Sequence, residues 1–172
     1  MRNWFYEQMA MYSAYHRNGL NQITHHVGVP MIVFSLLVIL STVKVADFDT
    51  GPLTLAAVLM GFLLLFYVLV APLVGVIAAL FYGFLMVVAE GVSLMETPSA
   101  WQSFLGLFIL GWVIQFTGHI FEKRKPALFD NLMQVFMAPS FLIAEVLFMA
   151  GLEQALKAEI EARMPKYMPK EN

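Results

Sequence analysis

Long apolar segments separated by short polar ones dominate the pattern of this chain. Four of them cover residues 27–46, 53–70, 73–95 and 100–121. Each is close to the ~20 residues that an α-helix needs to cross the hydrocarbon core of a bilayer. The breaks between them are DFDTGP, Ala71-Pro72 and METPS, which have the composition of loops and turns. The pattern therefore predicts four membrane-spanning helices.

The N-terminal segment has a different periodicity. Residues 3–17 form one apolar stripe at helical spacing, with two further aromatic residues beside it. The stripe is Phe5, Met9, Tyr12 and His16, flanked by Trp4 and Tyr15. Trp and Tyr favour the level of the lipid headgroups, so residues 1–20 are predicted to form an amphipathic helix on the membrane surface. Asn18-Gly19 is a turn signal that ends it.

The C-terminal part contains a fifth apolar piece, residues 131–152, which Pro139 interrupts and which carries Glu145. Four spans and this piece fit an all-α polytopic bundle in which the fifth piece is a re-entrant or interfacial helix. Residues 153–172 are rich in charge and are expected to form a soluble tail. The whole chain, 1–172, is then a single integral-membrane domain whose membrane helices lie within 27–152.

Composition agrees with a membrane protein. The chain is 60% hydrophobic and 13% charged, whereas soluble domains average about 45–50% and about 25%. A net charge of −2 gives no indication of a nucleic-acid partner. The absence of cysteine excludes disulfides, thiolate metal sites and iron–sulfur clusters. The first residues contain no uninterrupted apolar run of the kind that signal peptides have.

The distribution of charge predicts the orientation, because Lys and Arg prefer cytoplasmic loops. Basic residues lie at the N-terminus, after the fourth span and in the tail, whereas the loops after spans one and three are mainly acidic. The basic positions are Arg2, Arg17, Lys123, Arg124, Lys125, Lys157, Arg163, Lys166 and Lys170, and the acidic ones are Asp47, Asp49 and Glu96. Four spans with both termini in the cytoplasm satisfy this pattern, and a fifth full span would not. A compact chain favours a bacterial inner membrane, or the endoplasmic reticulum in a eukaryote.

The histidines fall at one membrane face in this arrangement. His16 ends the surface helix, His25 and His26 stand at the mouth of the first span, and His119 stands at the end of the fourth. An even number of crossings returns the fourth span to the side where the first began. Three separate segments that carry imidazole are therefore predicted to meet.

Such a cluster has the composition of a metal site. His119 and Glu122 are neighbours on a helix surface, with Gln115 one turn earlier. Histidine and carboxylate without cysteine suit Fe(II), Zn(II) or Mn(II), and two histidines with one carboxylate are the usual ligands of non-haem Fe(II) oxygenases. Glu145, inside an apolar segment, is a second candidate carboxylate.

A simpler interpretation exists for each of these residues. Histidines near a membrane interface also serve as amphipathic anchors. Glu122 also has a plausible role in a surface ion pair with the basic run that begins at Lys123.

Two motifs resemble the signatures of a known family, the Mpo1-like membrane proteins. YHRNGLNQITHHVGVP resembles a first signature in which a histidine is followed by N-x-x-x-H-x-x-G-x-P. Its positions are His16, Asn21, His25, Gly28 and Pro30. The second signature is matched by Gln115, Phe116, Gly118, His119, Glu122, Pro126, Ala127, Leu128, Ala138, Pro139, Phe141 and Glu145, with Glu122 one residue earlier than in the pattern. The middle spans match only as apolar sequence.

The resemblance implies an Fe(II)-dependent dioxygenase of fatty-acid α-oxidation, which converts a long-chain 2-hydroxy fatty acid and O₂ into the fatty acid one carbon shorter. It implies iron ligands and catalytic residues among His16, His25, His119 and Glu122, with Glu145 as the other candidate ligand. Tyr15, Asn21, His26 and Gln115 are then candidates to hold the free ring nitrogens of the ligands. Lys123 and Arg124 would attract the substrate carboxylate, unless they serve only as topology signals.

Two other classes of protein compete with this interpretation. Membrane desaturases and hydroxylases resemble H-x-x-H-H boxes and need more histidines than the four of this chain. A non-enzymatic lipid-binding scaffold or a small transporter subunit would need no metal at all.

Overall fold

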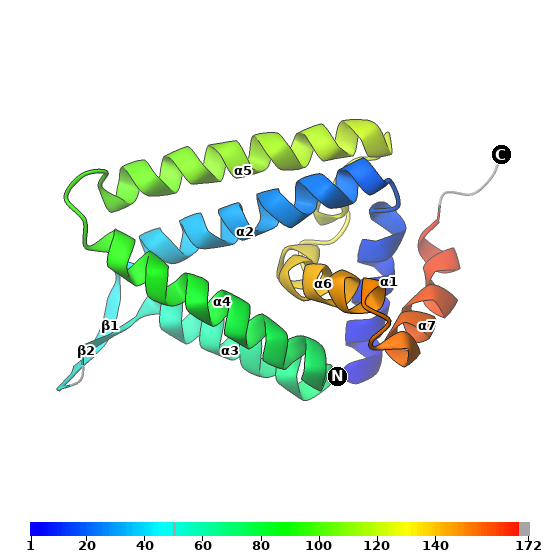
Figure 1. Ribbon diagram of the computed structural model, residues 1–172, viewed down its shortest axis with the longest axis horizontal. Helices are drawn as coiled ribbons and strands as arrows, with labels where there is room; N and C mark the ends of the chain where they lie inside the picture. Colours follow the sequence, from blue (N-terminus) through cyan, green and yellow to red (C-terminus); the bar gives the residue numbers. More distant parts are fainter. Residues whose placement is uncertain (50, 169–172) are drawn as a thin grey trace.

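The computed structural model describes residues 1–49 and 51–168, and this part of the chain is almost entirely helical (Figure 1). The elements in order are α1 Arg2–Tyr15, α2 Gly19–Ser41, β1 Lys44–Phe48, β2 Gly51–Thr54, α3 Leu55–Val70, α4 Pro72–Ser93, α5 Ala100–Glu122, η1 Ala127–Phe129, α6 Gln134–Met149, α7 Gln154–Arg163 and η2 Met164–Tyr167.

Three helices, α2, α4 and α5, are long and apolar enough to cross a membrane, and α3 is a shorter apolar helix of 16 residues. The predicted spans 53–70, 73–95 and 100–121 agree with α3, α4 and α5 to within two residues at each end. The all-α membrane bundle is confirmed. Helix α6 and the segment from α7 to η2 form an apolar pair bent by 119°, the geometry of a broken span or a re-entrant loop. The re-entrant or interfacial assignment of residues 131–152 stays a prediction.

The first span is displaced from its predicted position at residues 27–46. Helix α2 begins eight residues earlier because the Asn18 side chain accepts hydrogen bonds from the backbone N–H groups of Leu20 and Asn21, a typical N-cap. It ends at Ser41, and the next residues form an antiparallel hairpin of β1 and β2 instead. Gly51 has φ 128°, a conformation that only glycine adopts easily, which allows the tight reversal. Thr50, in the predicted loop DFDTGP, lies outside the described residues.

Helices α2 and α5 lie side by side and run in opposite directions, so the start of α2 and the end of α5 meet at one end of the bundle (Figure 1). Glycines allow this close contact. A Cβ atom on Gly28 would lie 3.0 Å from the carbonyl oxygen of Gly111, and one on Gly118 would lie 2.0 Å from Thr24 Oγ1. Small residues commonly permit such approach between membrane helices.

The predicted N-terminal helix is confirmed as α1, but its apolar stripe packs on protein. Phe5 and Met9 are fully buried, and the Phe5 ring packs edge-on against Phe66 of α3 at 6.0 Å. The membrane-surface location of residues 1–20 stays a prediction.

The charged tail forms a second partner for α1. Helix α7 buries Leu156 and Ile160, and Arg163 pairs with Glu7 of α1 at 3.5 Å. The tail therefore packs on the bundle as far as residue 168. Residues 169–172 of the predicted soluble tail, with Lys170, lie outside the described residues.

Candidate metal centre

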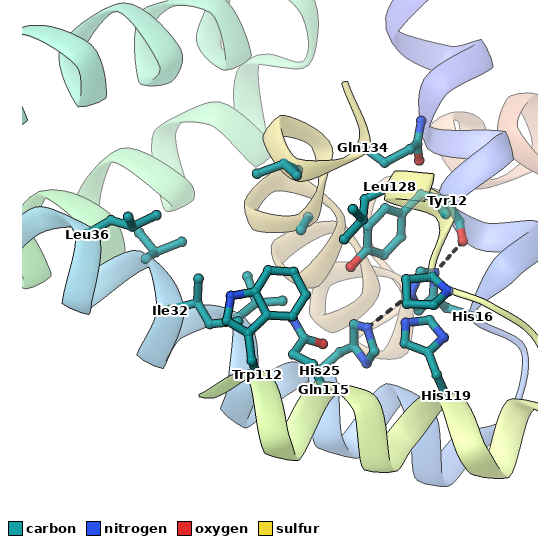
Figure 2. Close-up of a pocket in the computed structure, with 16 residues that line it drawn as sticks. Tyr12, His16, His25, Ile32, Leu36, Trp112, Gln115, His119, Leu128 and Gln134 are labelled. Atoms are coloured by element: carbon teal, nitrogen blue, oxygen red, sulfur yellow. Dashed lines mark hydrogen bonds between the residues drawn. The ribbon is translucent and has the colours of Figure 1, made fainter. Parts of the chain in front are cut away.

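Three of the four histidines meet at the end of the bundle where α1, α2 and α5 converge (Figure 2). His16 caps the C-terminus of α1, His25 lies in the second turn of α2, and His119 lies in the last turn of α5. One nitrogen of each ring lies within 4.8 Å of the others, and all three residues are buried. The convergence expected from the number of membrane crossings is thus present.

Backbone carbonyl groups fix the orientation of two of these rings. His16 Nδ1 lies 2.7 Å from the Tyr12 carbonyl oxygen, and His25 Nδ1 lies 2.8 Å from the Asn21 carbonyl oxygen. A carbonyl oxygen only accepts, so each Nδ1 carries the proton and donates it. In the neutral ring the Nε2 atom is then left as a bare acceptor.

These two Nε2 atoms face each other at 3.1 Å. Two lone pairs repel at that distance unless a cation lies between them. Burial lowers the pKa of the His16 imidazole well below its usual value, and the neighbouring His25 lowers it further. A proton on this ring is therefore unfavourable as the positive charge between the two nitrogen atoms. Two nitrogen ligands about 2.1 Å from one metal ion, at right angles, are about 3 Å apart. The separation therefore fits a shared metal ion.

His119 supplies the third ring. Its Nδ1 atom is buried, and no hydrogen-bond partner for it exists in the described part of the chain. Buried polar groups nearly always have a partner, and a bound ion is one of the standard explanations when the protein supplies none. The three histidines thus fit a divalent ion that accepts neutral nitrogen ligands.

The two candidate carboxylates lie outside this group. Glu122 accepts hydrogen bonds from the backbone N–H groups of Arg17 and Asn18, at 3.1 and 2.8 Å, and from Asn21 Nδ2 at 3.0 Å. It therefore ties the end of α5 to the turn between α1 and α2. Glu145 instead faces His26, with Oε2 3.9 Å from Nε2. A ligand role for either carboxylate stays a prediction.

Three other residues predicted around the site, Tyr15, Lys123 and Arg124, lie outside the pocket. Tyr15 donates its hydroxyl hydrogen to Asp130 at 2.7 Å. The Arg124 guanidinium covers the Tyr15 ring at 3.3 Å and donates to backbone carbonyl groups of α1 and η2, both at 2.9 Å. Lys123 is exposed and ends α5 with a left-handed φ of 55°. None of these side chains lines the pocket that contains the histidines.

That pocket is a mainly apolar cavity of about 90 Å³ with the three histidines in its wall (Figure 2). The Tyr12 ring stacks on His16 at 4.0 Å. The remaining lining residues are Val29, Ile32, Val33, Leu36, Trp112, Gln115, Pro126, Ala127, Leu128, Gln134, Val135 and Ala138. The sequence interpretation did not assign Tyr12 or Trp112 to the site. Their spacing was the available signal, since Tyr12 precedes His16 by four residues and Trp112 precedes His119 by seven, on the same helix faces.

The fold and this site define a helical membrane protein with a buried group of three histidines. Residues 2–150 match the model of a family described as 2-hydroxy-palmitic acid dioxygenase Mpo1-like. The chain is 36% identical over 158 residues to 2-hydroxy-palmitic acid dioxygenase MPO1 of Saccharomyces cerevisiae (strain ATCC 204508 / S288c), covering 90% of this chain and 86% of that protein. No solved structure matches the chain significantly. The chain belongs to the Mpo1-like family, as its two sequence signatures indicated.

Proposed function

We propose that this chain is a membrane-bound, iron(II)-dependent dioxygenase that converts a long-chain 2-hydroxy fatty acid into the fatty acid one carbon shorter. The observation that carries the proposal is the buried group of three histidines in the wall of an apolar pocket. The name of the yeast relative, a 2-hydroxy-palmitic acid dioxygenase, supports the substrate class and the type of reaction.

The donor set supports the choice of metal. His16, His25 and His119 would hold the ion, and neutral nitrogen ligands suit iron, zinc and manganese. Zinc has no redox chemistry, whereas an oxygenase needs a metal that exchanges electrons. Bound iron(II) would supply the activation of O₂.

The overall reaction balances without a separate reductant. A 2-hydroxy acid R–CH(OH)–COOH and O₂ give R–COOH, CO₂ and H₂O. The bond between carbons 1 and 2 breaks, carbon 1 leaves as CO₂, and carbon 2 becomes the new carboxyl carbon. The substrate gives up all the electrons that O₂ takes, so no reductase partner is required.

The surroundings of the histidines suit an amphipathic acid. Three neutral imidazoles leave the charge of a divalent ion uncompensated, which favours an anionic head group. Behind the head group, one stripe of α2 lines the pocket from His25 through Val29 and Ile32 to Leu36. At 1.5 Å per residue this stripe extends about 16 Å, so it offers the first part of an acyl chain an apolar wall.

The test is metal content and turnover of protein purified in detergent without oxygen and supplied with iron. Wild type should hold about one iron per chain and convert 2-hydroxyhexadecanoate and O₂ into pentadecanoate and CO₂. His119→Ala should lose both properties. The adjacent Ile120→Ala should keep them, since Ile120 is 72% exposed. Wild-type protein that binds no stoichiometric metal would overturn the proposal and favour a lipid-binding scaffold or a transporter subunit. Protein that binds only zinc would keep the metal site but overturn the oxygenase chemistry in favour of hydrolysis.

A further inference from the structure

Two amide side chains line the pocket, Gln115 and Gln134, and the Oε1 atom of each is buried without a hydrogen-bond partner among residues 1–49 and 51–168. Gln134 donates from Nε2 to Gln8 Oε1 at 2.8 Å and is therefore tied to α1, whereas Gln115 has no assigned task. Gln115 is only 8% exposed. An amide buried in this way destabilises the folded protein. Such groups need an explanation, and a bound partner is one.

Holding a ligand histidine does not explain Gln115. The Nδ1 atoms of His16 and His25 already donate to the carbonyl oxygens of Tyr12 and Asn21. The third ring, His119, makes no hydrogen bond to Gln115 Oε1, since both His119 Nδ1 and Gln115 Oε1 lack a partner among the described residues. The amide is therefore free to contact a molecule in the cavity that it lines.

Its position is fixed by the contact between α2 and α5. A Cβ atom on Gly28 would lie 2.9 Å from Gln115 Cγ, so only glycine at that position leaves room for the side chain. Gln115 lies one turn before His119 on α5, and Gly28 lies three residues after His25 on α2. The amide thus forms the next layer of the same pocket, beyond the histidines (Figure 2).

The layer beyond the amide is apolar. It contains Trp112 and Ile32, and the pocket continues to Leu36 (Figure 2). Along the wall that α2 and α5 form, the order is therefore histidines, then the Gln115 amide, then apolar side chains. An amphipathic molecule with its polar end at the histidines places its second polar group beside Gln115 and its chain beside Trp112.

We propose that Gln115 binds the 2-hydroxy-carboxylate head group, its N–H donating to the carboxylate and its carbonyl oxygen accepting from the 2-hydroxyl. This inference rests on the proposed function and specifies how the site selects its substrate. An amide presents one donor and one acceptor side by side, which complements an acid that carries a neighbouring hydroxyl. A fatty acid without the hydroxyl lacks the donor, so the buried Gln115 oxygen would stay unpaired beside it.

The test is equilibrium binding to iron-loaded protein without oxygen, with 2-hydroxyhexadecanoate and hexadecanoate as the two probes. Wild type should prefer the hydroxylated acid by about fivefold to a hundredfold, the range for leaving one buried acceptor, here the Gln115 oxygen, without its partner. Gln115→Leu should reduce that preference to within about twofold and keep its iron. Thr117→Val is the matched control, because Thr117 is an exposed residue of the same helix. It should bind as wild type does.

Gln115→Met removes the same polar atoms with a more flexible side chain and serves if the leucine variant does not fold. An iron-loaded variant of either kind that still prefers the hydroxylated acid as wild type does would overturn the role of Gln115. Equal binding of both acids by wild type would also overturn it. Both results are distinct from failure of the proposed function, in which wild type holds no iron or does not consume 2-hydroxyhexadecanoate.

Discussion

The substitution Gly118→Ala tests whether the contact between α2 and α5 sets the geometry of the metal centre. The added Cβ atom would lie 2.0 Å from Thr24 Oγ1 and 2.5 Å from Asn21 Oδ1. The first distance is about 1.4 Å short of the 3.4 Å at which ordinary contacts begin. Neither side chain moves away freely, because Thr24 donates to the Asn21 carbonyl oxygen and Asn21 donates to Glu122.

The helices must therefore separate, or one must rotate. Overpacking of this kind typically destabilises a protein by about 1–3 kcal/mol. The metal centre is more sensitive, since ligand distances in a metal site hold to within about 0.2 Å. A shift of α5 against α2 on the order of 1 Å would carry His119 away from His25. We expect a lower melting temperature and iron well below one per chain, measured by thermal unfolding and metal analysis in one detergent.

Gly106→Ala provides the control, because it makes the same chemical change on the same helix with nothing within 4 Å of the new Cβ atom. It should keep its iron and match or exceed wild-type stability, since alanine is favoured over glycine in a helix by about 1 kcal/mol. If Gly118→Ala held as much iron as Gly106→Ala and melted at the same temperature, the glycine contact would not control the site.

Three further substitutions or conditions address other parts of the structure. Glu122→Ala removes the acceptor of two backbone N–H groups at the turn before α2 and of the Asn21 amide in the first turn of α2. It should therefore lower the stability of the metal-free protein by about 1–3 kcal/mol, and an unchanged thermal unfolding curve would contradict this. Arg124→Ala should speed proteolysis of the C-terminal tail and leave KM unchanged, because Arg124 donates hydrogen bonds to α1 and η2 outside the pocket. A raised KM with an intact tail would instead support the predicted attraction of the substrate carboxylate by Arg124. Because burial lowers the pKa of His16, protons should not displace iron as the pH falls from about 7.5 to about 6; iron lost in step with an ordinary histidine titration would refute the burial argument.

The membrane helices could be predicted from the sequence where apolar runs meet charged or proline-containing loops, as at both ends of α4 and α5. The first span was predicted to begin eight residues too late, because hydropathy identifies the lipid-facing part of a helix. Residues 19–26 of α2, GLNQITHH, read as a polar segment before the membrane. In the structure they are helical, and Asn21 and His25 are buried against protein, at 0% and 4% exposed. A hydrophobicity measure therefore assigns a helical segment to a loop when its polar residues face a site inside the bundle.

The three histidines were predictable because their convergence depends only on the number and direction of crossings. The positions of the carboxylates were not, because they depend on where a helix ends and which groups lie next to that end. Spacing placed Glu122 beside His119 on one face of α5. The left-handed conformation of Lys123 ends the helix there. The backbone N–H groups of Arg17 and Asn18 then donate hydrogen bonds to the Glu122 carboxylate. Spacing along a helix does not specify such partners.

The glycines explain why the packing and the site cannot be separated in this fold. Gly28 and Gly118 allow the backbones of α2 and α5 to approach, and the atoms that would clash with added Cβ atoms belong to Gln115, Thr24 and Asn21. Two of these three residues also shape the site, since Gln115 lines the pocket and Asn21 supplies the carbonyl oxygen that orients His25. Membrane helices lack a hydrophobic driving force toward each other, so close van der Waals contact must supply much of their association. The contact that holds the two helices together is thus also the contact that positions the groups of the pocket.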